Sequence, residues 1–328
     1  MNYKPWFCLL LLWSIGIDSN AQQLSKQEVE GILKKIPVLI SENYVLKDKR
    51  AEIIHAFNNK VKSKRYASIQ SPDTLAKRLT SDLREISNDK HLYVKYYKST
   101  KKEASFDWEA WEKEERVLER TQNFGFTEVK ILPEAIGYLR IVEFMHPKRG
   151  MSTAVAAMKF VEHTDGLIID LRGNGGGYGG LMNYILNHYF DGGPTHISTT
   201  LYSDEQEPPN KEYTSDLVYG KLRVDTPLYI ITNKKTGSAA EFFCYTLQSF
   251  GKAKVIGQAT AGAAHLNTFY ELNNNFRISI STAAPINPKT KGNWENKGVI
   301  PDVVVHKNVI EKTHELMLKE IKNQTETN

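Results

Sequence analysis

The spacing of apolar residues changes along the chain, from a helical period to separate apolar strands. Within residues 22–90, apolar side chains recur at intervals of three and four. One such stripe is formed by Leu75, Leu79, Leu83 and Ile86. This interval places the side chains on one face of a helix. The pattern predicts a small bundle of three helices.

Two of these helices carry sequence signals for their first residue. Ser25 is followed three positions later by Glu28, which is the spacing of a capping box. Ser71 precedes Pro72, and proline is favoured at the first helical position. We therefore expect helices to begin directly after Ser25 and Ser71.

From about residue 126 the chain alternates between apolar strands and helices. The predicted strands cover 136–144, 166–171, 227–232 and 253–257, and the predicted helices cover 152–163, 181–190 and 239–250. Near-continuous apolar strands that alternate with helices are typical of an α/β layer with parallel pairing. The fold class predicted from this pattern is α/β.

Four other segments have weaker patterns. We expect a strand at 91–96, a half-exposed strand at 276–281 with strict alternation, and a final helix at about 308–322. Residues 99–121 are rich in charge. They are better explained as a solvated helix or excursion than as a binding surface.

The first residues resemble a signal peptide. Lys4 precedes an apolar run at 7–17, and Ser19-Asn20-Ala21 is a small-residue cleavage site. The run is short for a membrane span. We expect cleavage after Ala21 and a secreted or periplasmic protein. Cys244 would then be its one cysteine, packed as a small core residue without a disulfide.

Composition excludes some partners. The formal net charge of +5 over 328 residues is modest and spread out, so nucleic acid is not an expected partner. The histidines and carboxylates show no H-x-x-x-H or comparable spacing, so no metal site is predicted. We expect no cofactor.

Ser238 is a candidate nucleophile. It lies in T-G-S-A-A-E, between the predicted strand 227–232 and the predicted helix 239–250. A serine on a strand-to-helix turn presents its hydroxyl among backbone N–H groups, as in several serine hydrolases. The alternative is a plain capping box with Glu241. The two roles are compatible, because a helix N-terminus also favours developing negative charge.

A glycine-rich loop follows the predicted strand 166–171. Its sequence, R-G-N-G-G-G-Y-G-G, allows close backbone approach to a ligand. Gly175, Gly177 and Gly180 also fit the G-x-G-x-x-G dinucleotide pattern, with Asp191 downstream. The loop lies in mid-chain of a protein expected to be secreted, where nicotinamide cofactors are scarce. This position favours an anion-holding loop over a dinucleotide site.

These motifs resemble a known family. The segments I-I-D-L-R-G-N-G-G-G, T-G-S-A-A-E-F-F and V-I-G-Q-A-T-A-G are similar to those of the C-terminal processing (tail-specific) serine peptidases. With E-N-Y-V and N-D-K-H-L-Y-V upstream, the chain most resembles the branch similar to interphotoreceptor retinoid-binding protein and the tricorn protease core.

The resemblance implies a crotonase-like α/β core of stacked ββα units with an N-terminal helical bundle. We expect a signal peptide over 1–21, the bundle over 22–90 and the peptidase core over 91–328. The implied activity is that of a serine endopeptidase acting on peptides or proteins. The alternative is a non-catalytic module on the same fold that binds a hydrophobic ligand or a peptide. Oligomeric state is not predicted.

The resemblance also bears on the general base. Ala263 occupies the position, 25 residues after Ser238, at which the processing peptidases carry a lysine. The tricorn-like branch implies instead a histidine and a glutamate, which correspond here to His91 and Glu295. Lys90 stands where tricorn carries an orienting serine. His265 is a second candidate base.

An oxyanion hole completes the implied triad mechanism. It would consist of backbone N–H groups of Ala239, Gly175 and Gly176.

Overall fold

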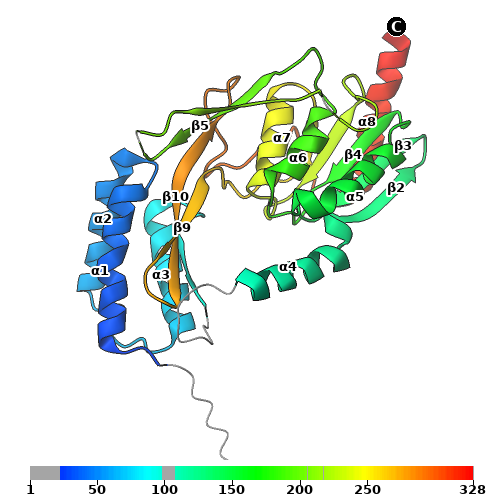
Figure 1. Ribbon diagram of the computed structural model, residues 1–328. Coiled ribbons are helices and arrows are strands. Elements are labelled where there is room, and N and C mark those ends of the chain that lie inside the picture. The colour runs from blue at the N-terminus through cyan, green and yellow to red at the C-terminus, as the bar shows by residue number, and fades with distance from the viewer. Residues whose placement is uncertain (1–22, 98–107, 205, 217, 328) are drawn as a thin grey trace, which may run out of the picture.

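The computed structural model describes residues 23–97, 108–204, 206–216 and 218–327, which form two β-sheets and eight α-helices. Figure 1 shows a helical bundle at one end and a helix-covered sheet at the other, with the long strand β10 (Phe276–Ile286) between them. The predicted signal peptide lies outside the described residues. Among the described helices, none is long and apolar enough to cross a bilayer.

The bundle consists of α1 (Lys26–Asn43), α2 (Lys47–Lys62) and α3 (Pro72–Ser87). Both predicted helix starts are confirmed. The Glu28 N–H donates to Ser25 Oγ, while the Glu28 carboxylate accepts from the Ser25 N–H at 2.8 Å. Ser71 also caps α3, since its Oγ accepts the Thr74 N–H at 3.4 Å, and Pro72 is the first residue of the helix.

The bundle shares its core with a five-stranded sheet. The sheet has the order β1-β10-β5-β6, and β9 pairs with β10 as well. Its strands are antiparallel, with bounds β1 (Tyr93–Tyr96), β5 (His196–Tyr202), β6 (Asn210–Tyr213) and β9 (Leu266–Glu271). Phe276, Ile278 and Ile280 of β10 pack with the helices. The division predicted at residue 90 stays a prediction.

The prediction of a half-exposed strand at 276–281 is wrong in extent and burial. Strand β10 runs to Ile286, and Ser279 and Ser281 on its second face are also buried. Ser279 Oγ donates to the His91 carbonyl at 2.6 Å. Strict alternation predicts one solvent-exposed face, but a small hydroxyl side chain such as Ser279 can be buried when it finds an acceptor.

The second sheet has six strands in the order β11-β8-β7-β4-β3-β2. Their bounds are β2 (Phe126–Leu132), β3 (Ile136–Ile141), β4 (Gly166–Asp170), β7 (Leu228–Thr232), β8 (Lys254–Gly257) and β11 (Val303–Val304). All neighbours are parallel except β2 with β3. Every residue of β4 and β7 is buried, which is why these strands read as continuous apolar runs.

Helices cover both faces of this sheet (Figure 1). The main core packs α5 (Pro147–Phe160), α6 (Gly179–Asn187) and α7 (Ala239–Ser249) against one face. Helix α8 (Val309–Thr327) covers the other face with Met317. The predicted α/β fold class is confirmed. Since β4 and β7 are parallel neighbours, the loops that follow them meet at one edge of the sheet.

The charged segment is partly a packed helix. Helix α4 (Trp108–Thr121) covers its second half, and residues 99–107 lie outside the described part of the chain. Arg149 of α5 pairs with Glu115 at 3.0 Å and with Glu119, whose side chain is buried. These ion pairs fix one face of α4 to the core, so the segment is not simply a solvated excursion.

Candidate active site

Ser238 occupies the strained turn between β7 and α7. Its φ of 52° and ψ of −121° are unusual for a residue that is not glycine. The buried Glu241 carboxylate holds the turn by accepting the Ser238 N–H at 2.9 Å. It also accepts the Gly262 N–H at 2.5 Å and the Ala263 N–H at 2.9 Å. Glu241 therefore makes the bond to the Ser238 N–H that the predicted capping box requires. The same carboxylate also joins the Ser238 turn to the loop before β9.

The glycine-rich loop lies directly against this turn. A Cβ on Gly176 would come within 2.8 Å of Ser238 Cβ and 3.0 Å of the Ala239 nitrogen, so glycine is required at this position. Asn174 supports the loop from behind, because its Oδ1 accepts the Gly176 N–H at 2.8 Å. In this conformation the Gly176 N–H is therefore already bonded. The Ala239 N–H, at the start of α7, has no acceptor within its helix.

A cavity of about 430 Å³ opens beside Ser238. Its lining combines Ser238 and His265 with the apolar side chains of Phe242 and Trp294. His91 is not among its lining residues. The cavity thus exposes the candidate nucleophile and one of the two candidate bases to the same space.

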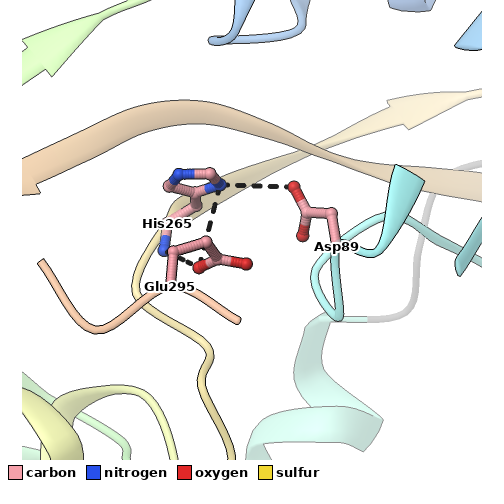
Figure 2. A group of neighbouring side chains, drawn as sticks. All are labelled: Asp89, His265 and Glu295. Carbon is pink, nitrogen blue, oxygen red and sulfur yellow. Dashed lines mark hydrogen bonds and ion pairs between the residues drawn. The ribbon is translucent and has the colours of Figure 1, made fainter. Parts of the chain in front are cut away.

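His265 contacts two carboxylates from distant parts of the chain. Its Nδ1 lies 3.3 Å from Asp89 Oδ2 and 3.8 Å from Glu295 Oε2. Figure 2 shows Nδ1 turned toward both carboxylates, while the other ring nitrogen points away from them. Asp89 follows α3, His265 precedes β9, and Glu295 lies after β10. The three side chains are 2%, 4% and 8% exposed, respectively.

Backbone and hydroxyl groups fix both carboxylates. Tyr44 donates its hydroxyl to Asp89 Oδ2 at 3.0 Å, and the His91 N–H donates to Asp89 Oδ1 at 2.7 Å. Glu295 Oε2 accepts the Ala264 N–H at 2.6 Å and the His265 N–H at 3.1 Å. Glu295 Oε1 is buried and has no hydrogen-bond partner among the described residues.

The pKa values of the three groups diverge. Burial opposes ionisation of Asp89, but hydrogen bonds led by that of His265 lower its pKa to about 2. Burial also opposes protonation of His265, yet the Asp89 hydrogen bond and the nearby Glu295 charge raise its pKa. The pKa of Glu295 is raised, first by burial and then by the Asp89 charge, against the opposing effect of His265. Such divergence is typical of functional sites.

His91 has a different environment. Its ring Nδ1 is buried and makes no hydrogen bond within the described ranges, and burial lowers its pKa. Among the described residues, the His91 ring makes no hydrogen bond to Ser238 or to Glu295. The neighbouring Lys90 donates to the Ala261 carbonyl, on the loop that Glu241 also holds. Asp89 is not among the predicted site residues, although an acidic residue two positions before a histidine is a usable sequence signal.

Asp89, His265 and Glu295 each offer one atom that could coordinate a metal ion, and these three atoms lie within 4.8 Å of one another. This is the one group of at least three possible metal ligands among the described residues. Sequence spacing could not reveal it, because its members are far apart in the chain.

Two family models match the sequence. The model of peptidase family S41 covers residues 135–305, just over half of the 328 residues. The model of the N-terminal domain of peptidase S41 in eukaryotic IRBP covers residues 21–123. The chain belongs to peptidase family S41.

Curated relatives of this S41 chain include processing proteases. It is 27% identical over 196 residues to the carboxy-terminal processing protease CtpB of Bacillus subtilis (strain 168), covering 59% of this chain and 39% of that protein. It is 26% identical over 181 residues to a carboxyl-terminal-processing protease of Synechocystis, covering 54% and 39%. The chain thus spans about two fifths of the length of these relatives. The predicted resemblance to the serine-type processing peptidases is confirmed.

Two solved structures share the fold of this protein over most of the chain. A lipoprotein from Streptococcus agalactiae has a TM-score of 0.59 at 18% identity, with 90% of this chain and 97% of the other covered. The tricorn protease has a TM-score of 0.61 at 14% identity, with 91% and 37% covered. At these identities the likeness establishes the fold alone.

Proposed function

We propose that this S41 chain is a secreted or periplasmic serine endopeptidase in which Ser238 is the nucleophile and His265 the general base. The observation that carries this proposal is the shared cavity, which Ser238 and His265 both line. The Asp89 carboxylate, 3.3 Å from His265 Nδ1, supports it. The signal-like first residues, over 1–21, are the reason to place the protein outside the cytoplasm.

The tautomer of His265 follows from its partner. An ionised carboxylate can only accept hydrogen bonds. Nδ1 of His265 therefore carries the ring proton and donates a hydrogen bond to Asp89. The other ring nitrogen, Nε2, then holds a free electron pair that can take the Ser238 proton. Asp89 orients the ring, and both carboxylates stabilise the imidazolium that forms.

The reaction then runs in two halves. Ser238 Oγ attacks the peptide carbonyl as its proton passes to Nε2, and the oxyanion is held by the Ala239 N–H and by N–H groups of the loop around Gly175. Collapse breaks the C–N bond, and His265 returns the proton to the leaving amine. Water then attacks the acyl-enzyme with the same base, releasing the acid and restoring Ser238.

His91 remains the alternative base that family resemblance implies, with Glu295 as its orienting carboxylate. In our proposal Glu295 acts on His265 instead, from 3.8 Å. The apolar cavity lining also suits the second candidate function, a non-catalytic module that binds a hydrophobic ligand or peptide.

A fluorophosphonate probe distinguishes these possibilities. The purified protein should be labelled at Ser238, located by mass spectrometry, and labelling should disappear in Ser238→Ala and His265→Ala. Loss of labelling in His91→Ala but not in His265→Ala would move the base to His91. Absence of labelling in folded protein would favour the binding module.

A further inference from the structure

We propose that Asp89, His265 and Glu295 form a zinc site, and that a bound Zn²⁺ ion would switch the peptidase off. The ligand atoms are His265 Nδ1, Asp89 Oδ2 and one Glu295 oxygen, all within 4.8 Å of one another. The inhibitory consequence rests on the proposed function, whereas the binding itself does not.

The distances suit a small divalent ion. Nitrogen and oxygen ligands lie about 2.0–2.1 Å from zinc, and tetrahedral angles then separate them by about 3.3 Å. The separations from Nδ1 here are 3.3 Å to Asp89 and 3.8 Å to Glu295. The carboxylate oxygens of Asp89 and Glu295 are at most 4.8 Å apart, so rotation of these two side chains would bring all three groups onto one ion.

The charges of the cluster favour a cation. Two carboxylates face one imidazole in a nearly dry environment, so the cluster with neutral His265 carries two negative charges. The Glu295 side chain is only 8% exposed, yet its Oε1 has no hydrogen-bond partner among the described residues. Figure 2 shows this carboxylate turned toward Asp89. A divalent ion would neutralise the excess charge and would be coordinated by the unpaired oxygen.

An outer shell of hydrogen bonds already orients the ligands. Asp89 accepts from Tyr44 and from the His91 N–H, and Glu295 accepts from the Ala264 and His265 N–H groups. Partners of this kind fix ligand geometry in known metal sites and contribute to affinity.

Binding would change the tautomer of the proposed base. Zinc takes the electron pair of Nδ1, so the ring proton must move to Nε2 in a neutral imidazole. Nε2 then has no free pair for the Ser238 proton, and the nucleophile loses its activation. Because the ligands are 2–8% exposed, we expect slow onset, with ion entry limited by opening of the surrounding loops.

Calorimetric titration with Zn²⁺ tests the site without using activity. In the full chain carrying Ser238→Ala, we expect one ion per chain. Adding Asp89→Asn, Glu295→Gln or His265→Gln should weaken binding at least about tenfold, and the matched control His91→Gln should not. Circular dichroism checks folding, and if Asp89→Asn unfolds, the other two ligand variants decide. Absence of one-to-one binding, or binding equal in all variants, would overturn the proposal.

Labelling separates this inference from the proposed function. Preincubation of the unsubstituted protein with Zn²⁺ should lower fluorophosphonate labelling of Ser238 at least about tenfold, and EDTA should restore it. Labelling without zinc binding would refute the metal site and leave the peptidase proposal intact. Zinc binding without labelling of Ser238 under any condition would support the metal site and refute the peptidase proposal.

Discussion

Two buried acidic clusters of this molecule are built with opposite charge balance. In the bundle, Asp82 is completely buried and accepts from Arg65 Nε at 2.8 Å, Tyr66 at 2.9 Å and Lys60 at 3.3 Å. One carboxylate therefore has two cations and a hydroxyl. Burial opposes its ionisation, but these hydrogen bonds keep its pKa below the ordinary value of 3.8.

The cluster beside the cavity reverses this balance. Asp89 and Glu295 share one imidazole, and Glu295 Oε1 has no partner among the described residues. A buried carboxylate with two cationic partners holds the fold together. Where two carboxylates share one imidazole, the carboxylate whose pKa is raised, Glu295, reduces stability when it is ionised, and a binding or catalytic role would explain that cost. The comparison predicts that substitutions in the two clusters affect different properties.

The largest expected effect is on activity at the cavity. Ser238→Ala and His265→Ala should each lower peptidase kcat/KM by about 10⁴-fold or more, because the pair acts as a unit. The thermal midpoint of Ser238→Ala should stay close to that of the unsubstituted protein, whereas His265→Ala should also lower it, because the buried Asp89 carboxylate loses its imidazole partner. Peptide hydrolysis and calorimetric scans measure both, with His91→Ala as the control for a nearby buried ring. Retained turnover in folded Ser238→Ala would show that Ser238 is not the nucleophile and that this cluster does not serve catalysis.

The serine side of this site could be predicted because its determinants are local. The buried strand, the strained turn and the helix of Ser238 are consecutive in sequence, and the glycine loop has the same arrangement after β4. The two loops meet because β4 and β7 are parallel neighbours. Alternating strands and helices imply this topology, so both the fold class and the candidate nucleophile could be predicted.

The carboxylate cluster could not be predicted in the same way. Asp89, His265 and Glu295 come together only because β1, β9 and β10 pair at one register. That antiparallel sheet depends on long-range contacts, and neither β5, β6 nor β9 has a strong local pattern. The sequence therefore offered two histidines, and family resemblance pointed to His91 while the cavity favours His265.

In the bundle, stability should change instead. Asp82→Asn should lower the free energy of unfolding by about 2–3 kcal/mol, less than for a wholly buried pair because Arg65 and Lys60 keep contact with water. Urea titration measures the loss. Activity per folded molecule should be unchanged. A stable variant with impaired hydrolysis would show that Asp82 does not have a purely structural role.

The pH dependence of stability sharpens this prediction. The folded-state pKa of Asp82 is depressed, so its contribution is fully present above about 3.8 and is lost as pH falls through the lower folded value. The difference in unfolding free energy between the unsubstituted protein and Asp82→Asn should thus shrink below about pH 3.8. Urea titrations of both proteins between pH 7 and pH 3 measure it. A constant difference would place the effect of the substitution in packing.

The smallest expected effect has the opposite sign. The folded-state pKa of Glu295 is raised, first by burial, so ionised Glu295 reduces stability as pH rises above its ordinary value of 4.5. Glu295→Gln removes that charge, and its amide oxygen can still accept the Ala264 N–H. At pH 7 and without metal, we expect the variant to gain a few tenths to about 1 kcal/mol of stability and to lose activity. Urea titration and peptide hydrolysis measure the two changes. A clear loss of stability would mean that Glu295 resembles Asp82, and that the two clusters differ in position alone.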